Sequence, residues 1–211
     1  MNETSAPPYD LAQATADLTA ADAVLGDLIA AVGPCTLEIR AHEPFVALLR
    51  AIVYQQLSGK AAGTIHGRVL ALFGAEVLSP EALLAVPDEA LRGAGLSRAK
   101  TRAVKDLAEK TLDGTVPDQT ALQPLTNEEV IERLTAVRGV GPWTVEMLLM
   151  FTLGRPDVLP VADLGVRHGY RLLYDHDELP SPSALRAHGE RWRPWRSVAS
   201  WYLWRAVDRA R

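Results

Sequence analysis

The feature that most constrains the fold is a glycine-rich turn between two helical patterns, Arg-Gly-Val-Gly-Pro at residues 138–142. Two glycines one residue apart allow positive φ and let another backbone come close. A proline directly after them fits the first turn of a helix, because its missing N–H has no intrahelical partner there. Such a turn presents unpaired N–H groups beside a helix N-terminus, which suits the binding of a phosphate. A plain connection between two packed helices has the same composition, so the turn alone leaves both interpretations open.

Beyond the turn, the chain leads to a single aspartate at the start of another helix. Apolar residues at helical spacing follow Trp143, and Gly154 ends that helix. A loop and an apolar stretch then reach Asp163, which precedes Leu-Gly-Val-Arg and is predicted to be an N-cap. The N–H donors of a helix start favour the ionised carboxylate, so a capping Asp163 can also be a fixed negative charge at neutral pH. Serving only as a cap is the alternative.

These two segments carry a specific resemblance. The stretch LTAVRGVGPWT (134–144), followed by LPVADLGVRHG (159–169), resembles the helix-hairpin-helix, Gly/Pro-rich, Asp-containing superfamily of base-excision DNA glycosylases. Within that superfamily the chain is most similar to the alkylation-repair branch of 3-methyladenine DNA glycosylase II type. Residues 44–62, 91–108 and 191–206 support the resemblance, which extends from about residue 35 to the C-terminus. The hairpin alone also occurs in DNA-binding proteins that catalyse nothing.

The pattern of the chain predicts an all-α fold. Nearly every segment has helical periodicity, and no alternating run is long enough to require a sheet. Thr126 and Glu129 form a predicted capping box that opens the first hairpin helix, and Thr19 with Asp22 resembles another for a helix that ends before Gly33. The resemblance implies two helical lobes with a DNA-binding cleft between them, one formed by 44–155 and the other by 1–43 together with 156–211.

The resemblance also implies roles for particular residues. It makes Asp163 the catalytic residue, places Trp143, Trp204 and Tyr54 in a base pocket, and assigns DNA binding to the hairpin residues Arg138, Gly139, Val140 and Gly141. The wedge that fills the gap left by an extruded base falls at Gln56 or Leu57. Relatives with an apolar wedge align it with Gln56, so this chain departs from them, and a solvated helix end is the alternative for its two adjacent glutamines. The remaining tryptophans, Trp192, Trp195 and Trp201, are expected in the core.

The chemistry implied by the resemblance needs only one carboxylate. An alkylated purine such as 3-methyladenine is cationic and leaves as a neutral base, so little acid catalysis is required. The sugar develops oxocarbenium character, which Asp163 would stabilise electrostatically while orienting the attacking water. The nucleotide must be extruded from the duplex first. A desolvated indole attracts a cationic base by about 1–2 kcal/mol more than a neutral one.

Two other functions stay open at this point. A non-catalytic DNA-binding module would retain the hairpin but need no aspartate at 163. A bifunctional glycosylase/lyase would need an amine that forms a Schiff base. In relatives with lyase activity a lysine stands just after the glycine turn, where this chain has Trp143. The sequence therefore favours a monofunctional hydrolase.

Composition limits partners and cofactors. The net charge of −4 is polarised: residues 1–34 hold five acidic residues and no Lys or Arg, whereas seven arginines lie between Arg186 and the C-terminus. Cys35 is the only cysteine, which excludes an internal disulfide and a four-cysteine iron–sulfur cluster and favours a cytoplasmic location. The five histidines show no metal-ligand spacing and are expected at the surface or at helix ends. We expect no required cofactor, with room for a structural monovalent cation at the hairpin. The expected partner is duplex DNA that contains alkylated bases. We expect the protein to act as a monomer and not to associate with a membrane.

Overall fold

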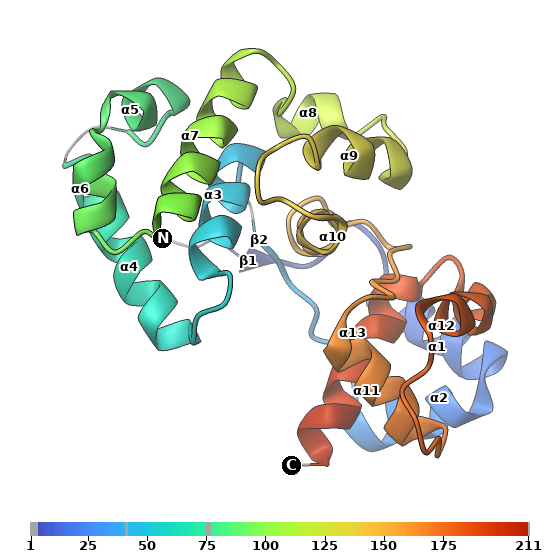
Figure 1. The fold of residues 1–211 in the computed structure, drawn as a ribbon. Helices are drawn as coiled ribbons and strands as arrows, with labels where there is room; N and C mark the ends of the chain where they lie inside the picture. The colour runs from blue at the N-terminus through green and yellow to red at the C-terminus, as the bar shows by residue number, and fades with distance from the viewer. Residues whose placement is uncertain (1–3, 41, 75–76, 211) are drawn as a thin grey trace. The chain divides into compact units, whose positions relative to one another are not determined.

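The computed structural model describes residues 4–40, 42–74 and 77–210, and its Cα atoms group into two compact units (Figure 1). One unit is continuous, 42–148, and the other combines 1–41 with 149–211. The lobes expected from the sequence, with boundaries at residues 44 and 155, stay a prediction.

The unit of residues 42–148 is built from helices joined by short loops. Its elements are α3 (Pro44–Tyr54), α4 (Gly59–Ala71), α5 (Pro80–Ala85), α6 (Asp88–Gly93), α7 (Arg98–Leu112), α8 (Gln119–Leu122), α9 (Asn127–Leu134) and the first seven residues of α10 (Pro142–Phe151).

Local chemistry explains where these helices begin. Pro44 opens α3, and the apolar face of this helix is buried, with Leu48, Leu49, Ile52 and Val53 at 0% exposure. Serine side chains cap the N-termini of α4, α5 and α7. The capping box predicted at Thr126 and Glu129 is confirmed, since the hydroxyl of the first accepts from the N–H of the second and the carboxylate bonds back.

The second unit gathers both ends of the chain around one core. It contains β1 (Thr4–Ser5), α1 (Leu11–Ala21), α2 (Ala23–Val32), β2 (Ile39–Arg40), α11 (Leu164–Leu173), α12 (Pro182–Gly189), the 3₁₀ turn η1 (Glu190–Trp192) and α13 (Arg196–Arg209). Apolar residues of α2, α11 and α13 pack into a common cluster that includes Leu25, Val166 and Tyr202, all at 0% exposure. The two short strands pair antiparallel, with Thr4 opposite Arg40 and Ser5 opposite Ile39.

The prediction that a helix begins at Thr19 is wrong. Two helices occupy this region: Asp10 caps α1, and Asp22 caps α2 through the N–H of Leu25. Thr19 lies inside α1, and its hydroxyl donates to the carbonyl of Thr15. An Asp is as good a cap as a Thr, and only packing decides which of two nearby candidates starts a helix.

The predicted all-α class is confirmed. Over the described residues, the β1–β2 pair is the only sheet. No helix in the described ranges is long and apolar enough to cross a membrane.

Candidate active site

Asp163 is held at the start of α11 by two hydrogen bonds to a single oxygen. Its Oδ1 accepts from the backbone N–H of Val166 at 2.7 Å and from the indole Nε1–H of Trp204 at 2.9 Å. The predicted capping role is thereby confirmed. Both hydrogen bonds fix the orientation of the carboxylate, which lies half-buried. The result is a pre-oriented carboxylate beside an aromatic ring.

A close approach of α11 and α13 makes this contact possible. A Cβ added to Gly169 would lie 2.0 Å from the carbonyl oxygen of Leu203, so no larger residue fits between the two helices there. One turn earlier, a Cβ on Gly165 would lie 2.8 Å from Cδ1 of Trp204 and 3.1 Å from Oδ1 of Asp163. The glycines at i and i+4 therefore form the groove in which the indole reaches the carboxylate.

Trp204 is also supported from its other side. The ring of Phe151, the last residue of α10, stacks on it with a centroid distance of 5.9 Å and an interplanar angle of 29°. Both rings are half-buried. In the sequence Phe151 is one of the apolar residues at helical spacing that follow Trp143, and nothing there marks it as a partner of Trp204. The expectation of core positions is confirmed for Trp192 and Trp201, at 0% and 8% exposure, whereas Trp195 is half-buried and its indole donates to Asp17.

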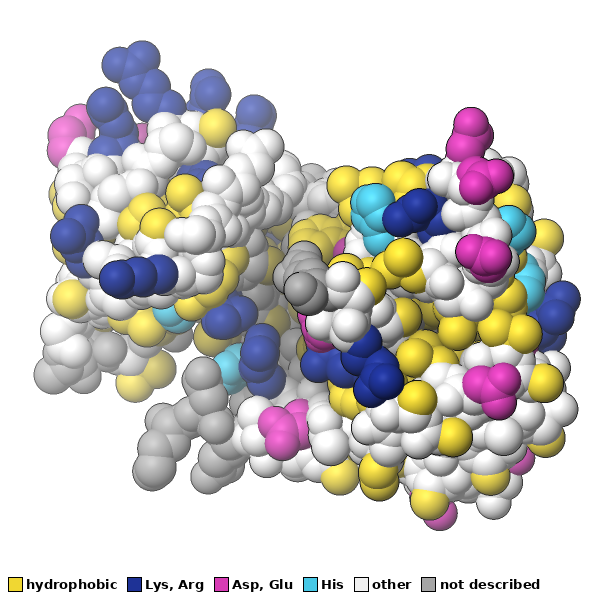
Figure 2. All heavy atoms as spheres, turned by 90° about the horizontal axis from the view of Figure 1, so that it is seen from below, with side chains coloured by type: hydrophobic (Ala, Val, Ile, Leu, Met, Phe, Trp, Pro, Cys, Tyr) yellow, Lys and Arg dark blue, Asp and Glu magenta, His cyan; other side chains and the backbone are white. Residues whose placement is uncertain are grey.

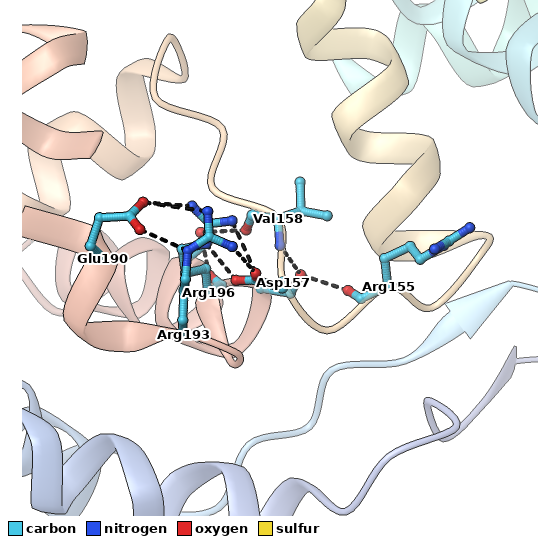
Figure 3. A network of polar contacts seen from close by, with 8 residues as sticks. Arg155, Asp157, Val158, Glu190, Arg193 and Arg196 are labelled. Carbon is cyan, nitrogen blue, oxygen red and sulfur yellow. Dashed lines mark hydrogen bonds and ion pairs between the residues drawn. The ribbon is translucent and has the colours of Figure 1, made fainter. Parts of the chain in front are cut away.

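The loop that leads to Asp163 is tied to the first turns of α13 (Figure 3). Arg196, 9% exposed, donates through Nε and Nη2 to the two carboxylate oxygens of Asp157, and Arg193 donates to the same carboxylate. Ser197 adds two bonds, since its Oγ donates to the Arg155 carbonyl at 2.7 Å and accepts from the Val158 N–H at 3.1 Å. Loop and helix are thus joined by side chains that lie about 40 residues apart in the chain. The loop precedes Asp163 and the helix carries Trp204, whose indole donates to Asp163.

The glycine turn is folded less symmetrically than its sequence indicates. Only Gly139 has a positive φ, at 77°, and Gly141 does not. The N–H of Arg138 donates to Oδ2 of Asp106 at 2.6 Å, and the N–H of Val140 donates to the Val137 carbonyl at 3.0 Å.

This geometry limits which groups of residues 138–141 can donate to a phosphate at the predicted site. The Val140 side chain is 5% exposed and its amide donates within the turn, so neither group is available to a phosphate in this conformation, and its role in DNA binding stays a prediction. The side chain belongs to the core because it fills the space under the turn. Among the described residues, the amides of Gly139 and Gly141 donate no hydrogen bond. These two N–H groups and the exposed side chain of Arg138 are available to an anion.

An aromatic pocket lies beside this turn, within the unit of residues 42–148. Its volume is 560 Å³, and its lining includes Tyr54, Gln56, Gly139, Gly141 and Trp143. The structure thereby brings together two of the three predicted base-pocket residues. The Tyr54 ring carries the guanidinium of Arg50 at 4.0 Å from its centroid, and Trp143 is 45% exposed.

The two wedge candidates differ in backbone conformation. Gln56 has a φ of 56°, in the left-handed region that few side chains other than Gly, Asn and Asp adopt. Its side chain is exposed, as is that of Leu57 at 40%. Gln56 lines the aromatic pocket and also a second pocket of 300 Å³ with Lys100 and Arg138. Leu57 lines neither.

Basic residues of α7 divide into two groups. Arg98 and Arg102 are exposed, and Lys and Arg side chains stand out in the space-filling view (Figure 2). Lys100 and Lys105 instead donate to backbone carbonyls, two for the first and three for the second. Partial burial lowers the pKa of the Lys100 ammonium. The two arginines therefore face solvent, whereas the two lysines are engaged by backbone carbonyls of the protein.

Sequence reasoning missed Gln55, Lys100 and Gly165 as contributors to the site. The signal for Gly165 was present as the Gly-x-x-x-Gly spacing with Gly169, which indicates close helix packing. No local signal reveals the contacts that Gln55 and Lys100 make, because their partners lie 45 to 84 residues away. In the described ranges no cluster of three or more His, Cys, Asp or Glu side chains could hold a metal ion.

Comparison with known proteins places this geometry in a family. Residues 49–194 match the model of the HhH-GPD superfamily base excision DNA repair proteins. DNA-3-methyladenine glycosylase 1 of Schizosaccharomyces pombe is 41% identical over 164 residues, which are 77% of this chain and 72% of that protein. The solved structure of a 3-methyladenine DNA glycosylase of the same yeast in complex with abasic DNA superposes with a TM-score of 0.82 at 37% identity, over 92% of this chain and 95% of that one.

A bacterial structure is similar to the same degree. DNA-3-methyladenine glycosidase from Bacillus halodurans has a TM-score of 0.84 and 39% identity, and the match covers 97% of this chain and 92% of the other. The match to the family model covers well over half of the residues and includes the glycine turn and Asp163. This chain therefore belongs to the HhH-GPD superfamily of base excision DNA repair proteins.

Proposed function

We propose that this protein is a monofunctional DNA glycosylase that hydrolyses the N-glycosidic bond of alkylated bases in duplex DNA. The observation that carries the proposal is the Asp163 carboxylate, held by a helix N-terminus and by the Trp204 indole. A cap alone has no need of an aromatic donor on the same oxygen. The names of the similar yeast and bacterial proteins, all 3-methyladenine glycosylases or glycosidases, support the substrate class.

The fixed carboxylate suits a dissociative hydrolysis. As the bond from C1′ to a cationic base breaks, its electron pair stays with the base, which leaves neutral. Positive charge then develops on the sugar, and a preorganised carboxylate stabilises it without reorganisation. Water adds to C1′ and loses a proton, for which Asp163 is the acceptor at hand. The target nucleotide is first extruded from the stack.

We favour a hydrolase over a lyase because a lyase needs an amine nucleophile near the site. Trp143 occupies the position at which lyase relatives carry lysine. Lys100 lines a pocket beside the turn, but its Nζ donates at 2.7 Å to the carbonyls of Val53 and Gln55, so it is engaged within the protein and not directed at a substrate. The proposal includes a monomer acting on duplex DNA without a cofactor in the chemistry. A monovalent cation at the hairpin would bind backbone carbonyls and serve the turn, not the reaction.

Replacement of Asp163 by asparagine tests the proposal. Asparagine caps helices as well as aspartate does, so α11 should persist while the charge is lost. Single-turnover release of 3-methyladenine or 7-methylguanine should fall by on the order of a hundredfold or more. Asp10→Asn is the matched control, because Asp10 also caps a helix of this unit, and it should retain full activity.

The products of the wild-type reaction complete the test. The strand should stay intact until alkali cleaves it at the abasic site, and borohydride should trap no covalent adduct. Near-normal base release by Asp163→Asn would reduce Asp163 to a cap. A trapped adduct would overturn the hydrolase assignment and direct attention to Lys60 and Lys100.

A further inference from the structure

A reverse turn after α3 presents Gln56, and its conformation is unusual enough to need support. The helix ends at Tyr54, and Gln56 follows with φ at 56°. Left-handed backbone at a residue other than Gly, Asn or Asp persists only where surrounding contacts impose it. Gln56 itself is exposed, so its own side chain does not supply them.

Lys100 supplies one set of contacts. Its Nζ donates to the carbonyls of Val53 and Gln55, each at 2.7 Å. These carbonyls belong to the C-terminal end of α3, where backbone acceptors lack intrahelical partners and a cation is favoured by the helix dipole. A charged donor that spans two carbonyls on either side of Tyr54 holds the chain in the reversal.

Gln55 supplies the second set and links the turn to the hairpin. Its Nε2 donates to the carbonyl of Gly139 at 2.8 Å, across 84 residues of sequence. Gly139 is the positive-φ residue of the hairpin, and its own N–H is one of the two amides available to a phosphate. Turn and hairpin are therefore joined at one residue, Gly139, and both line the same two pockets.

We propose that Gln55 and Lys100 are positioning residues that lock Gln56 in the conformation in which it enters the base stack, and that Gln55 couples this entry to phosphate binding at Gly139. The inference rests on the proposed function, since entry of a side chain presupposes an enzyme that extrudes a nucleotide. It assigns the wedge to Gln56 and not to Leu57. Neither Gln55 nor Lys100 touches the reacting atoms.

The test uses DNA distortion and needs no catalysis. A duplex carries a tetrahydrofuran abasic analogue beside a 2-aminopurine, whose fluorescence rises when a side chain unstacks it. At saturating wild-type protein the fluorescence should rise. Gln55→Leu and Lys100→Met should lose at least half of that rise, and their single-turnover excision from paired duplex should slow by about tenfold, as expected for a misplaced group. Excision of the same lesion from an unpaired bubble should change less than twofold.

The chain offers a matched control on the same helix. Lys105 also donates to helix-end carbonyls, those of Leu83, Leu84 and Val86 in and after α5, but it does not touch the turn. Lys105→Met should retain the full rise and the full duplex activity, whatever it costs in stability. Equal losses in Lys105→Met and Lys100→Met would overturn the proposal, because they would reflect general loosening.

A double mutant shows whether Gln55 acts through Gln56. Glycine at position 56 suits the positive φ and removes the wedge. The Gln55→Leu/Gln56→Gly protein should therefore give no smaller a rise than Gln56→Gly alone. A further loss in the double mutant, a normal rise in folded Gln55→Leu, or no rise with wild type would each refute the proposal. A normal rise together with no base release by wild type would leave this proposal standing and refute the glycosylase assignment.

Discussion

At Gly165, the absence of a side chain is what lets the Trp204 indole reach the Asp163 carboxylate. A methyl group there would contact Cδ1 of the indole at 2.8 Å and Nε1 at 2.9 Å, both below van der Waals distance. Glycine is a poor helix former, so Gly165 does not stabilise α11. It leaves the space that the Trp204 indole needs to reach Asp163.

We predict that Gly165→Ala displaces Trp204 and slows single-turnover excision by about tenfold, while overpacking lowers the free energy of unfolding by about 1–3 kcal/mol. Gly67→Ala is the control. Gly67 lies in α4 with nothing within 4 Å of an added Cβ, so this substitution should stabilise the protein by roughly 0.5–1 kcal/mol and leave excision unchanged. Urea unfolding and base release measure the two effects. Unchanged excision by folded Gly165→Ala would contradict the role given to the Trp204 contact.

The indole of Trp204 is also predicted to select for charge. Trp204→Ala should slow the release of cationic bases more than that of a neutral base such as hypoxanthine, by about 1–2 kcal/mol or roughly five- to thirtyfold in relative rate. Loss of stacking area alone slows both alike, so the ratio separates charge recognition from packing. The uncatalysed loss of each base is subtracted. Equal slowing of both lesion classes would assign selectivity to the weak bond itself.

At the scale of elements, the loop between α10 and α11 depends on charges that α13 provides. Asp157 accepts from two arginines, and its partner Arg196 is almost fully buried. Removing the Asp157 carboxylate leaves Arg196, in a poorly solvated position, with Glu190 at 3.3 Å as its remaining counter-charge. An exposed pair carries no comparable cost.

We therefore predict that Asp157→Asn lowers the free energy of unfolding by about 1–3 kcal/mol. Asp208→Asn, which removes the partner of Arg205 in a pair with side chains 42% and 51% exposed, should cost less than about 1 kcal/mol. Denaturant unfolding at low and at high salt compares the two. A similar small cost for both variants would show that the network of Figure 3 contributes little to stability.

At the scale of the whole molecule, a buried polar cluster joins the N-terminal helices to the C-terminal part of the chain. Asp22, 5% exposed, accepts from the Tyr174 hydroxyl at 2.6 Å and the Trp192 indole at 3.0 Å. Burial raises the pKa of the Asp22 carboxyl, but the hydrogen bonds to it outweigh burial, so the pKa lies below its ordinary value. The cluster thus holds an ionised carboxylate inside the core.

His188 completes the cluster. It lies in the last turn of α12, as expected for histidines at the surface or at helix ends, and its ring is half-buried. Its Nε2 lies 3.3 Å from Oδ2 of Asp22, and its Nδ1 lies 3.1 Å from the Tyr170 hydroxyl. Burial lowers the pKa of His188, the charges of Arg191 and His176 lower it further, and Asp22 offsets only part of this. The network fits a neutral ring that donates to Asp22 and accepts from Tyr170.

Both pKa directions predict loss of stability in acid. Below pH 6.5, the ordinary value for His188, the unfolded chain binds a proton that the folded chain does not, so stability falls as pH drops toward the lowered folded pKa. Asp22 causes a second loss of stability below pH 3.8, its ordinary pKa, because there too the unfolded chain binds a proton that the folded chain does not. We expect a lower melting temperature at pH 5 than at pH 7.5, and His188→Gln should flatten this difference. The exposed His168, replaced by Gln, is the control and should leave it unchanged. An equally steep dependence in His188→Gln would place the titrating group elsewhere.

The sequence by itself determined what depends on neighbours within about four residues. Pro44, Thr126 with Glu129 and Asp163 mark helix starts because a fixed φ or a side-chain oxygen acts on the adjacent backbone. The glycine turn and Asp163 were also enough to place the chain in its family. The same local signals gave the wrong helix start at Thr19, because Asp22, three residues later, is an equally good cap.

Only the tertiary structure decided which distant groups meet. Trp204 lies 41 residues from Asp163, and Gln55 lies 84 residues from Gly139. Side-chain hydrogen bonds of this kind follow from how helices pack, and a linear pattern holds no record of the crossing that brings Gly169 against Leu203. The burial of Val140 and the engagement of Lys100 have the same origin, because turn geometry and carbonyl partners are set by neighbouring helices. The residue types thus indicated the chemistry, whereas the packing of the helices set the orientation of the side chains that carry it out.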